Sequence, residues 1–365
     1  MIRWRRIEQF FKYNQLRFLE KWLGKPGIPL GEFKSNEIKR ILIVRQHDQL
    51  GDFLLSTPVF RALRAKFPNA YVTVVARKYT ATLAQHNQYI DNVIVFYEHG
   101  RDWTLRKLYH FIKQLRDKYD LAVVLNTVSH SLTSDLIARF SGAMFILGSE
   151  HLLFHGTRRN FFYNLTAPYK TGTRNQSERN LDIVRFIGAD TNDLSEHITL
   201  LPSEKTWAVN FLKSRGWDGN KKIISIHPGA GKLGNRWPVD NFARVANKLA
   251  SDFNALLLTT WGPGEEDLGE KLITLITGPC LSVTHGEIRN VAALLSCSAL
   301  FLCNDTGVMH LAAAAGVPLV VVFGPTNPEE WKPAGEQFVA IRGINHKCSE
   351  IDSKDVIFLA KKMLN

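Results

Sequence analysis

Apolar and polar positions alternate in blocks from about residue 40 to the end of the chain. Short apolar runs, such as 41–44 and 319–323, have the length of buried strands. Between them lie segments whose apolar residues recur three and four positions apart, which is the period of amphipathic helices. Strands that alternate with helices predict a parallel sheet covered by helices. The pattern therefore predicts an α/β fold.

The predicted elements fall into two successive sets, separated near residues 190–220. Strands are expected at 41–44, 71–75, 92–96, 121–125 and 144–147, and then at 222–226, 255–259, 281–283, 299–303, 319–323 and 338–341. The main helices are expected at 57–66, 103–118, 131–140, 181–187, 206–215, 239–251 and 353–364, and residues 150–180 are expected to be irregular and basic. We therefore predict two Rossmann-like domains, at 39–195 and 196–350, with a terminal helix at 351–365.

The first 24 residues have a different pattern. Five large apolar residues fall on one helical stripe: Trp4, Ile7, Phe11, Phe18 and Trp22. Six basic residues lie mostly off this stripe: Arg3, Arg5, Arg6, Lys12, Arg17 and Lys21. A basic amphipathic helix of this kind suits an anionic membrane interface, although its stripe could instead pack on the protein itself. Residues 25–38 are expected to be a linker, so that 1–38 forms a separate N-terminal segment.

Composition narrows the class of partner. Of 365 residues, 45% are hydrophobic and 22% are charged, which is typical of a globular protein, and the formal net charge of +12 favours an anionic partner. The four cysteines have no metal-ligand spacing and suit a reducing compartment. Neither a signal peptide nor an apolar run of about 20 residues is apparent. We expect a cytoplasmic protein without a metal or cofactor.

The segment 304–326 carries the most informative motif. Asp305, Thr306 and Gly307 follow a predicted strand and precede a helix rich in alanine. A helix start at the carboxyl end of a parallel strand presents N–H groups that favour phosphate, and His310 could add a donor one turn later. The alternative interpretation is a capped helix, with Asp305 as the N-cap and His310 as a buried core histidine.

The loop after the first predicted strand offers a carboxylate. It is not a G-x-G-x-x-G loop, so a dinucleotide is not expected here. Asp52 follows Gly51, whose missing side chain allows close approach to a ligand, and such a carboxylate can accept a proton from a substrate hydroxyl. Asp52 could instead cap the helix, and Asp48 and His47 are competing candidates for the base.

The second set of elements offers groups that suit a nucleoside diphosphate. Three glycines, Gly229, Gly231 and Gly234, expose backbone N–H groups, and Lys232 and Arg236 add cations. Glu265 or Glu266, after the next predicted strand, could accept hydrogen bonds from ribose hydroxyls. A base in one half and a phosphate site in the other predict group transfer in a cleft between two domains.

These motifs resemble, in the same order, those of the lipopolysaccharide heptosyltransferase family, glycosyltransferase family 9. The motifs are Leu50-Gly51-Asp52 with Thr57-Pro58, His227-Pro-Gly-Ala, Arg236-Trp237-Pro238 and Asp305-Thr306-Gly307-x-x-His310. The resemblance implies a GT-B fold with two Rossmann-like domains that face a central cleft. It also implies an inverting, metal-independent sugar transfer from a nucleotide-diphosphate donor, which is ADP-heptose in the best-known members.

Residue roles carry over by match of motif. The resemblance implies that Asp52 is the general base, that Asp305, Thr306, Gly307 and His310 form the donor-phosphate loop, and that Glu265 binds the ribose. Arg45 and Gly51 are expected at the acceptor site. The family often has a lysine where this chain has Asn235, so Lys232 or Arg236 is expected to supply the cation beside the leaving group.

The expected partners are a nucleotide-diphosphate sugar and an anionic lipid-linked glycan, such as the lipopolysaccharide core. Residues 1–24 are expected to touch the inner face of the cytoplasmic membrane, and nucleic acid is not expected as a partner. Three rival functions remain open at this point: a non-catalytic nucleotide-sugar or glycan-binding protein, a nucleic-acid-binding protein, and a sugar-nucleotide epimerase on the same architecture.

Overall fold

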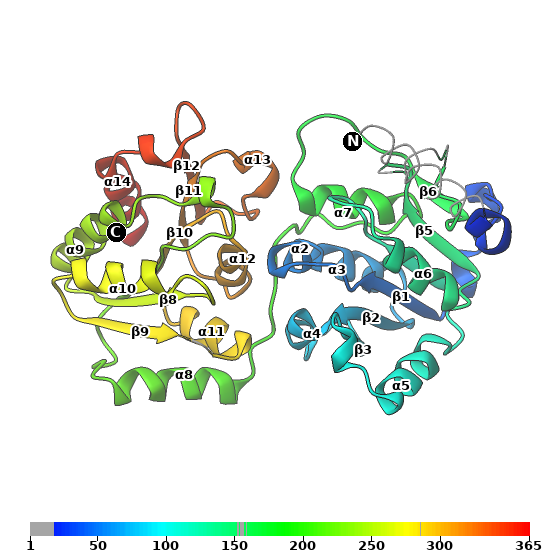
Figure 1. The fold of residues 1–365 in the computed structure, drawn as a ribbon, viewed down its shortest axis with the longest axis horizontal. Helices are drawn as coiled ribbons and strands as arrows, with labels where there is room; N and C mark the ends of the chain where they lie inside the picture. Colours follow the sequence, from blue (N-terminus) through cyan, green and yellow to red (C-terminus); the bar gives the residue numbers. More distant parts are fainter. Residues whose placement is uncertain (1–17, 152, 154–156, 158, 285) are drawn as a thin grey trace, which may run out of the picture. The chain divides into compact units, whose positions relative to one another are not determined.

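The computed structural model describes residues 18–151, 153, 157, 159–284 and 286–365. They form two compact units, each built on a six-stranded parallel sheet (Figure 1). The first unit contains the described residues up to Asp48, then Pro58–Gly172 and Gln176–Asp193. The second contains Gln49–Thr57, Thr173–Asn175 and Leu194–Asn365.

The first sheet has the strand order β3-β2-β1-β4-β5-β6. Its strands are β1 (Arg40–Arg45), β2 (Tyr71–Arg77), β3 (Asn92–Phe96), β4 (Leu121–Val124), β5 (Phe145–Ser149) and β6 (Leu165–Ala167). The helices of this unit are α3 (Thr57–Lys66), α4 (Lys78–Ala84), α5 (Leu105–Leu115), α6 (Leu132–Phe140) and α7 (Gln176–Arg185), with 3-10 turns at Leu30–Glu32, Ser35–Glu37 and Gly100–Asp102.

The second sheet has the order β12-β11-β10-β7-β8-β9. Its strands are β7 (Ile223–His227), β8 (Leu256–Trp261), β9 (Cys280–Thr284), β10 (Leu300–Asn304), β11 (Leu319–Phe323) and β12 (Phe338–Arg342). The helices are α2 (Leu50–Leu54), α8 (Pro202–Ser214), α9 (Val239–Phe253), α10 (Glu266–Leu275), α11 (Ile288–Leu295), α12 (Gly307–Ala314), α13 (Pro328–Trp331) and α14 (Ser353–Leu364), with 3-10 turns at Leu233–Asn235 and Cys348–Glu350.

Both sheets have the same topology. When the strands of each sheet are numbered from its own first strand, both follow the order 3-2-1-4-5-6 of a Rossmann fold. The strand order reverses between β1 and β4 in the first unit and between β7 and β10 in the second. Ligands of open α/β sheets bind at such a switch point, outside the carboxyl ends of the strands.

The second sheet is buried on both faces, as a parallel sheet requires. All five residues of β7 are buried, and successive side chains point to opposite faces. Ile224 and Ile226 share one apolar cluster with α9, α10 and α14, whereas Ile223 shares another with α8 and α11. This arrangement explains why the strand is a continuous apolar run in the sequence.

The core of the first unit combines apolar packing with buried polar side chains, among them Asp135. Phe111 and Leu115 of α5 and Ile137 of α6 pack in one cluster with Leu42 of β1. In the same region the Tyr163 hydroxyl donates to Asp135, 2.5 Å away. Burial raises the pKa of Tyr163 well above its usual value, and the negative charge of Asp135 adds to the effect.

Short elements were missing from the expected set. The sequence pattern did not predict α2, α4, α11, α13 or β6. Residues 150–180 were expected to be irregular, but they include β6 and the start of α7. With three residues, β6 is too short to show periodicity, and its hydrogen bonds to β5 define it instead.

The helix α2 follows β1 in the chain but belongs by its contacts to the second unit. It packs against α12, and a Cβ on Gly307 would lie 3.1 Å from the Leu50 Cβ. Glycine therefore permits the close approach of the two helices.

The expected N-terminal helix lies mostly outside the described residues, and so do Trp4, Ile7 and Phe11. Residues 18–23 are helical. Leu19 and Leu23 pack on the core of the first unit, while Phe18 and Trp22 are 62% and 67% exposed. The described part of the predicted stripe is therefore not buried on the protein. Within the described residues, no helix is both long and apolar enough to cross a bilayer.

We expect Gly148→Ala to lower the free energy of unfolding by about 1–3 kcal/mol, because a Cβ in β5 would overlap the buried ring of Tyr163. Denaturant unfolding measures the change. Gly100→Ala is the matched control, since no neighbouring heavy atom lies within 4 Å of its Cβ position. Equal stability of the two variants would contradict the packing described here.

Candidate functional site

A buried asparagine at the end of β10 joins the loops at the switch point of the second sheet. The Asn304 side-chain amide donates to the Pro228 and Gly229 carbonyls, at 2.8 and 3.2 Å, and its oxygen accepts from the Trp237 N–H at 3.0 Å. Asn304 is fully buried. One side chain thus fixes the glycine-rich loop, and a polar residue that ends an apolar strand was the available sequence signal.

Asp305 connects three loops of the second unit. Its Oδ2 accepts hydrogen bonds from the Asn235 amide at 2.9 Å and from the Thr326 hydroxyl at 2.6 Å. The loops after β7, β10 and β11 are therefore joined through one carboxylate. The N-cap of α12 is Thr306 and not Asp305, so the alternative in which Asp305 caps this helix is wrong.

The start of α12 is compact. Thr306 has an extended backbone, and its side chain makes no capping hydrogen bond. Gly307 lies against Leu50, so a side chain at this turn would be tightly packed and Leu50 would have to shift. An uncapped helix start carries a partial positive charge, which suits the phosphate role predicted for Thr306 and Gly307.

His310, one turn into α12, forms a buried pair with a residue that the sequence did not point to. Its Nδ1 lies 2.7 Å from Glu196 Oε1, and both side chains are almost completely buried. Burial alone would lower the pKa of His310, but the charge and hydrogen bond of Glu196, with the charges of Asp305 and Asp52, raise it. Burial raises the pKa of Glu196, and His310 opposes that shift. His310 is thus buried, as the alternative interpretation supposed, but it is held by a carboxylate that favours its charged form.

Glu265 lies beside the glycine-rich loop. Its Oε2 accepts from the Gly262 N–H at 2.9 Å and lies 3.3 Å from His227 Nε2. A Cβ on Gly229 would overlap the Glu265 carboxylate. Burial opposes the charge of Glu265, but His227 and the backbone hydrogen bond lower its pKa, so it is an anionic acceptor. Glu266, the other candidate, begins α10.

The two candidate cations differ in their contacts. Arg236 donates through Nε to the Ala230 carbonyl at 2.8 Å and places Nη2 4.0 Å from Glu265. Lys232 is exposed within the glycine-rich loop, between Gly231 and Gly234. The structure therefore places both predicted cations beside the loop and anchors only Arg236.

Asp52 and Gly51 lie on α2. The backbone N–H of Gln49 contacts Asp52 Oδ2 at 3.4 Å, in the geometry of a capping box. A Cβ on Gly51 would be 2.6 Å from the His310 ring, so only glycine fits beside this histidine. The packing of α2 on α12 brings the predicted base close enough for its charge to act on His310.

The competing candidates for the base lie in the first unit. Asp48 is buried and forms an ion pair with Arg45, whereas His47 is exposed. Arg45 also donates to the Leu125 carbonyl at 2.6 Å and is only 5% exposed. These contacts favour a structural task for Arg45 and Asp48, and the acceptor role of Arg45 stays a prediction.

Among the described residues, no three His, Cys, Asp or Glu side chains come together as a metal site requires.

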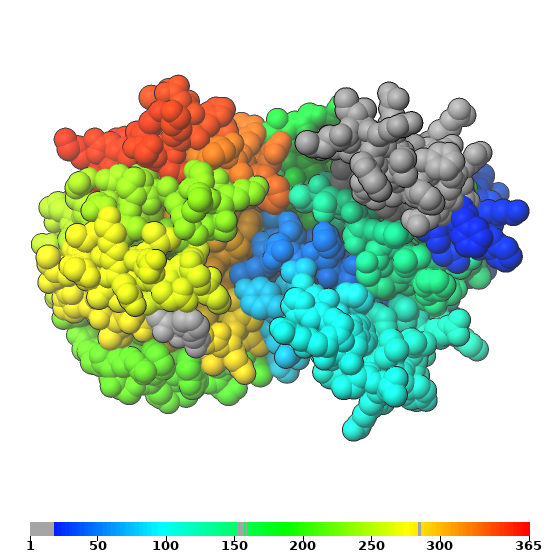
Figure 2. All heavy atoms as spheres, in the orientation of Figure 1, coloured from blue at the N-terminus to red at the C-terminus, as the bar shows by residue number. Residues whose placement is uncertain are grey.

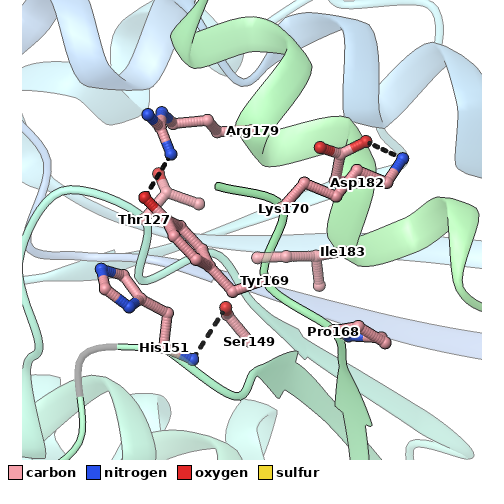
Figure 3. Close-up of a pocket in the computed structure, with 9 residues that line it drawn as sticks. All are labelled: Thr127, Ser149, His151, Pro168, Tyr169, Lys170, Arg179, Asp182 and Ile183. Carbon is pink, nitrogen blue, oxygen red and sulfur yellow. Dashed lines mark hydrogen bonds and ion pairs between the residues drawn. The ribbon is translucent and has the colours of Figure 1, made fainter. Parts of the chain in front are cut away.

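The expected basic segment 150–180 lines a hollow of the first unit, together with residues of α7 (Figure 3). Arg179 donates to the Tyr169 hydroxyl at 2.5 Å, and Lys170 pairs with Asp182 at 2.9 Å. Both basic side chains therefore have partners among the residues that line the same hollow.

Comparison with known proteins decides the family. The model of "Glycosyltransferase family 9 (heptosyltransferase)" matches residues 108–358. The chain belongs to glycosyltransferase family 9. The resemblance noted in the sequence is thus confirmed, and the protein is an enzyme that transfers a sugar.

Relatives and solved structures agree with this assignment. A lipooligosaccharide heptosyltransferase 2 of Haemophilus influenzae is 26% identical over 84% of this glycosyltransferase and 89% of its own length. A putative glycosyltransferase of the same organism is also 26% identical, over 82% of this chain and 87% of its own.

The structure of a family 9 glycosyltransferase from Veillonella parvula superposes with a TM-score of 0.77 at 22% identity, covering 89% of this chain and 97% of its own. The ADP-heptose lipopolysaccharide heptosyltransferase II of Escherichia coli gives a TM-score of 0.72 at 21% identity, with 89% and 98% covered. The predicted fold class, α/β of the GT-B type, is confirmed.

For this glycosyltransferase we expect Glu196→Gln to lower the pKa of His310. Glutamine can still accept from Nδ1, but the negative charge that stabilises the imidazolium is gone. The usual pKa of histidine is about 6.5. In the wild type the pKa of His310 is raised, so the ring stays charged at pH values somewhat above 6.5 and loses its charge as the pH rises through the raised pKa. In the variant this loss occurs at lower pH.

The measurement is an NMR titration of the ring, with His346 in the second unit as an internal reference that the substitution should not affect. A His310 titration that is the same in wild type and variant would show that Glu196 does not control its charge.

Proposed function

We propose that this glycosyltransferase moves a heptose from ADP-heptose to the core of lipopolysaccharide or to a similar anionic glycan, with inversion at the anomeric carbon. Family membership and the activities for which the relatives are named support the donor and acceptor classes. The observation that carries the mechanism is the packing of α2 on α12, because it brings Asp52 and the helix start at Thr306 into one unit.

The donor diphosphate is proposed to bind at the start of α12. The N–H groups of Gly307 and the following residue, the Thr306 hydroxyl and a charged His310 would each donate to phosphate oxygens. Lys232 or Arg236 would add a cation from the glycine-rich loop. Asp305 would act differently from these groups: its Oδ2 already accepts two hydrogen bonds, so its proposed task is to hold the loops in place.

The nucleoside is proposed to lie near the glycine-rich loop. Glu265 has a lowered pKa and is therefore anionic at neutral pH, and a carboxylate accepts hydrogen bonds from two neighbouring ribose hydroxyls well. Its contact with Gly229 would place the ribose next to the backbone of the loop. Gly229 would thus be required by Glu265 itself, apart from any ligand.

The transfer is proposed as a single displacement. Asp52 accepts the proton of the acceptor hydroxyl while that oxygen attacks the anomeric carbon from the face opposite the diphosphate. The new glycosidic bond forms as the bond between the anomeric carbon and the phosphate oxygen breaks, and ADP leaves with its bonding electron pair. The donors around the diphosphate stabilise the charge that develops on it.

A neutral residue, Asn235, stands where the resemblance implies a lysine, and loss of that cation would suit a non-catalytic protein. In this chain Asn235 has a task of its own, because it binds Asp305 within the loop network. The neutral residue therefore does not by itself indicate lost catalysis. No observation on the described residues favours nucleic-acid binding or an epimerase.

We further propose that the enzyme works in the cytoplasm as a peripheral protein of the inner membrane face. The acceptor class is lipid-linked, and the net charge of +12 suits an anionic surface. Exposure of Phe18 and Trp22 supports membrane contact by the N-terminal segment 1–24, since neither side chain is needed for packing on the first unit.

Asp52→Asn is expected to slow sugar transfer by about 10²–10⁴-fold, because an amide cannot accept the proton. Product formation from ADP-heptose and extracted lipopolysaccharide core, followed by mass spectrometry, measures the change. Binding of ADP should stay near the wild-type value, since the proposed phosphate donors are intact.

His47→Asn is the matched control for Asp52→Asn, because His47 is a nearby candidate for the base and is exposed. It should transfer sugar at nearly the wild-type rate. Wild-type transfer by Asp52→Asn together with a large loss in His47→Asn would reassign the base. Hydrolysis or epimerisation of several donors without transfer would instead overturn the proposed reaction.

Replacing Phe18 and Trp22 together by serine should weaken binding of the full chain to vesicles that contain phosphatidylglycerol. Two interfacial aromatic residues are lost, while Leu19 and Leu23 still hold the helix on the core. Flotation with the vesicles measures binding, and a truncation at Ser35 is less suitable because it also removes these packing residues. Unchanged flotation would exclude a membrane role for this part of the stripe.

A further inference from the structure

The helix α5 has apolar residues on two sides, of which the fold uses only one. Phe111 and Leu115 are buried in the core of the first unit. A second set of apolar side chains is exposed to solvent: Leu105 (87%), Leu108 (43%), Tyr109 (63%) and Ile112 (44%). We call this set the α5 stripe. In Figure 2 the atoms of α5, coloured cyan, lie at the surface of the first unit.

The spacing of the α5 stripe makes it continuous. Its positions follow the i, i+3, i+4, i+7 pattern of one helical face, so the four side chains adjoin each other over two turns. Scattered exposed apolar residues are ordinary, but a contiguous apolar face marks an interaction surface. Nothing among the described residues buries this face.

The charged residues within α5 itself are all basic. Leu105–Leu115 contains no acidic residue, and Arg106 and Lys113 are exposed on one flank of the stripe. Of the acidic residues that flank the helix, Asp117 pairs with Arg40, while Asp102 precedes the first turn. The helix therefore presents an apolar face bordered by cations, which is the composition of an interfacial helix.

A basic hollow lies at the carboxyl end of the same helix. It is open to solvent and is lined by Arg116, Lys118, Arg139, Phe140, Ser141 and Gly142. Three of the six lining residues are cations and none is acidic. Arg139 donates to the Leu23 carbonyl at 2.7 Å, so the hollow also reaches the helix at residues 18–23.

Lys25 adds a fourth basic group to this region. Burial lowers the pKa of Lys25, and the positive charge of Arg139 lowers it further, which indicates that the two cations are close. The ammonium group donates to the Ala143 and Met144 carbonyls at 2.6 and 2.8 Å, and Met144 is itself exposed. Basic and apolar groups thus alternate from α5 to the N-terminal helix.

We propose that the α5 stripe and the basic hollow together form a docking surface for an anionic lipid bilayer, with lipid phosphates in the hollow and the stripe at the acyl boundary. The residues of the stripe and of the hollow lie outside residues 1–24, although Arg139 of the hollow contacts Leu23. The proposal rests on the proposed function only in that a lipid-linked acceptor gives membrane docking a purpose.

Charge complementarity selects this occupant. A nucleic acid would pair with the cations but would gain nothing from Leu105 or Ile112. A second copy of the chain in a two-fold dimer would place two equally basic surfaces against each other. An anionic bilayer satisfies both features at once, because it offers phosphates and an apolar layer within one interface.

The test uses the full chain and two variants, with flotation on vesicles of phosphatidylethanolamine and phosphatidylglycerol or of phosphatidylcholine alone. Reversing the hollow, as Arg116→Glu with Lys118→Glu, should lower partitioning to the anionic vesicles by at least about tenfold, since each basic residue near such a surface contributes about fivefold. Leu105→Ser with Ile112→Ser should lower it by about tenfold as well. Wild-type binding to phosphatidylcholine should be weak.

Matched controls come from the second unit. Lys354→Glu with Lys362→Glu makes the same change of charge on α14, and Ile344→Ser removes an apolar side chain that is 92% exposed. Both should float like the wild type. All variants should keep wild-type transfer to a delipidated acceptor, which separates a failure of docking from a failure of the proposed reaction or of folding.

Two outcomes would overturn the proposal. One is flotation of the hollow and stripe variants at the wild-type level, whatever their transfer activity. The other is a concentration-dependent dimer of the wild type that the stripe variant abolishes without any change in flotation, because the α5 stripe would then be an interface between two copies of the chain.

Discussion

The close packing of α2 on α12 is the constraint on which the rest of the candidate site depends. Two helices can approach this closely only where small residues face each other, and Gly51 and Gly307 meet that need. Because of this contact, α2 belongs to the second unit, although it directly follows β1 of the first unit in the chain. As a result, Asp52 and His310, about 260 residues apart in the sequence, act on each other electrostatically.

Burial also affects whether His310 carries a charge. In a region shielded from water, a lone imidazolium would lose its proton, because desolvation disfavours the charged form. Glu196 provides a compensating carboxylate at hydrogen-bond distance, and the pair can hold a cation next to the helix start. The same principle applies at Asn304, where a fully buried amide is tolerated because each of its polar atoms has a backbone partner.

Sequence reasoning succeeded where a long pattern carried the information. The strands at 92–96 and 319–323 and the helix at 353–364 have the predicted bounds, because each is a complete apolar run or several turns of one period. It missed α2, whose five residues show no period, and Glu196, which becomes important only through a contact 114 residues away. The role of Asp305 was also hidden, since its partners Asn235 and Thr326 lie in other loops and spacing along the chain cannot show that they meet.

The neutral Asn235 would change the balance of charge around the proposed diphosphate. The cations proposed to act on this diphosphate are His310, Arg236 and Lys232. Arg236 is partly neutralised by Glu265 and is held by the Ala230 carbonyl, so it can respond little to charge that develops during the reaction. The positive charge of His310 is balanced by the carboxylate of Glu196. Lys232 is exposed in a loop with glycines on both sides, and no hydrogen bond or ion pair to another described residue holds its side chain. Where the resemblance implies a lysine, this chain has Asn235, which supports Asp305 instead, so under the proposed mechanism the compensating cation is Lys232.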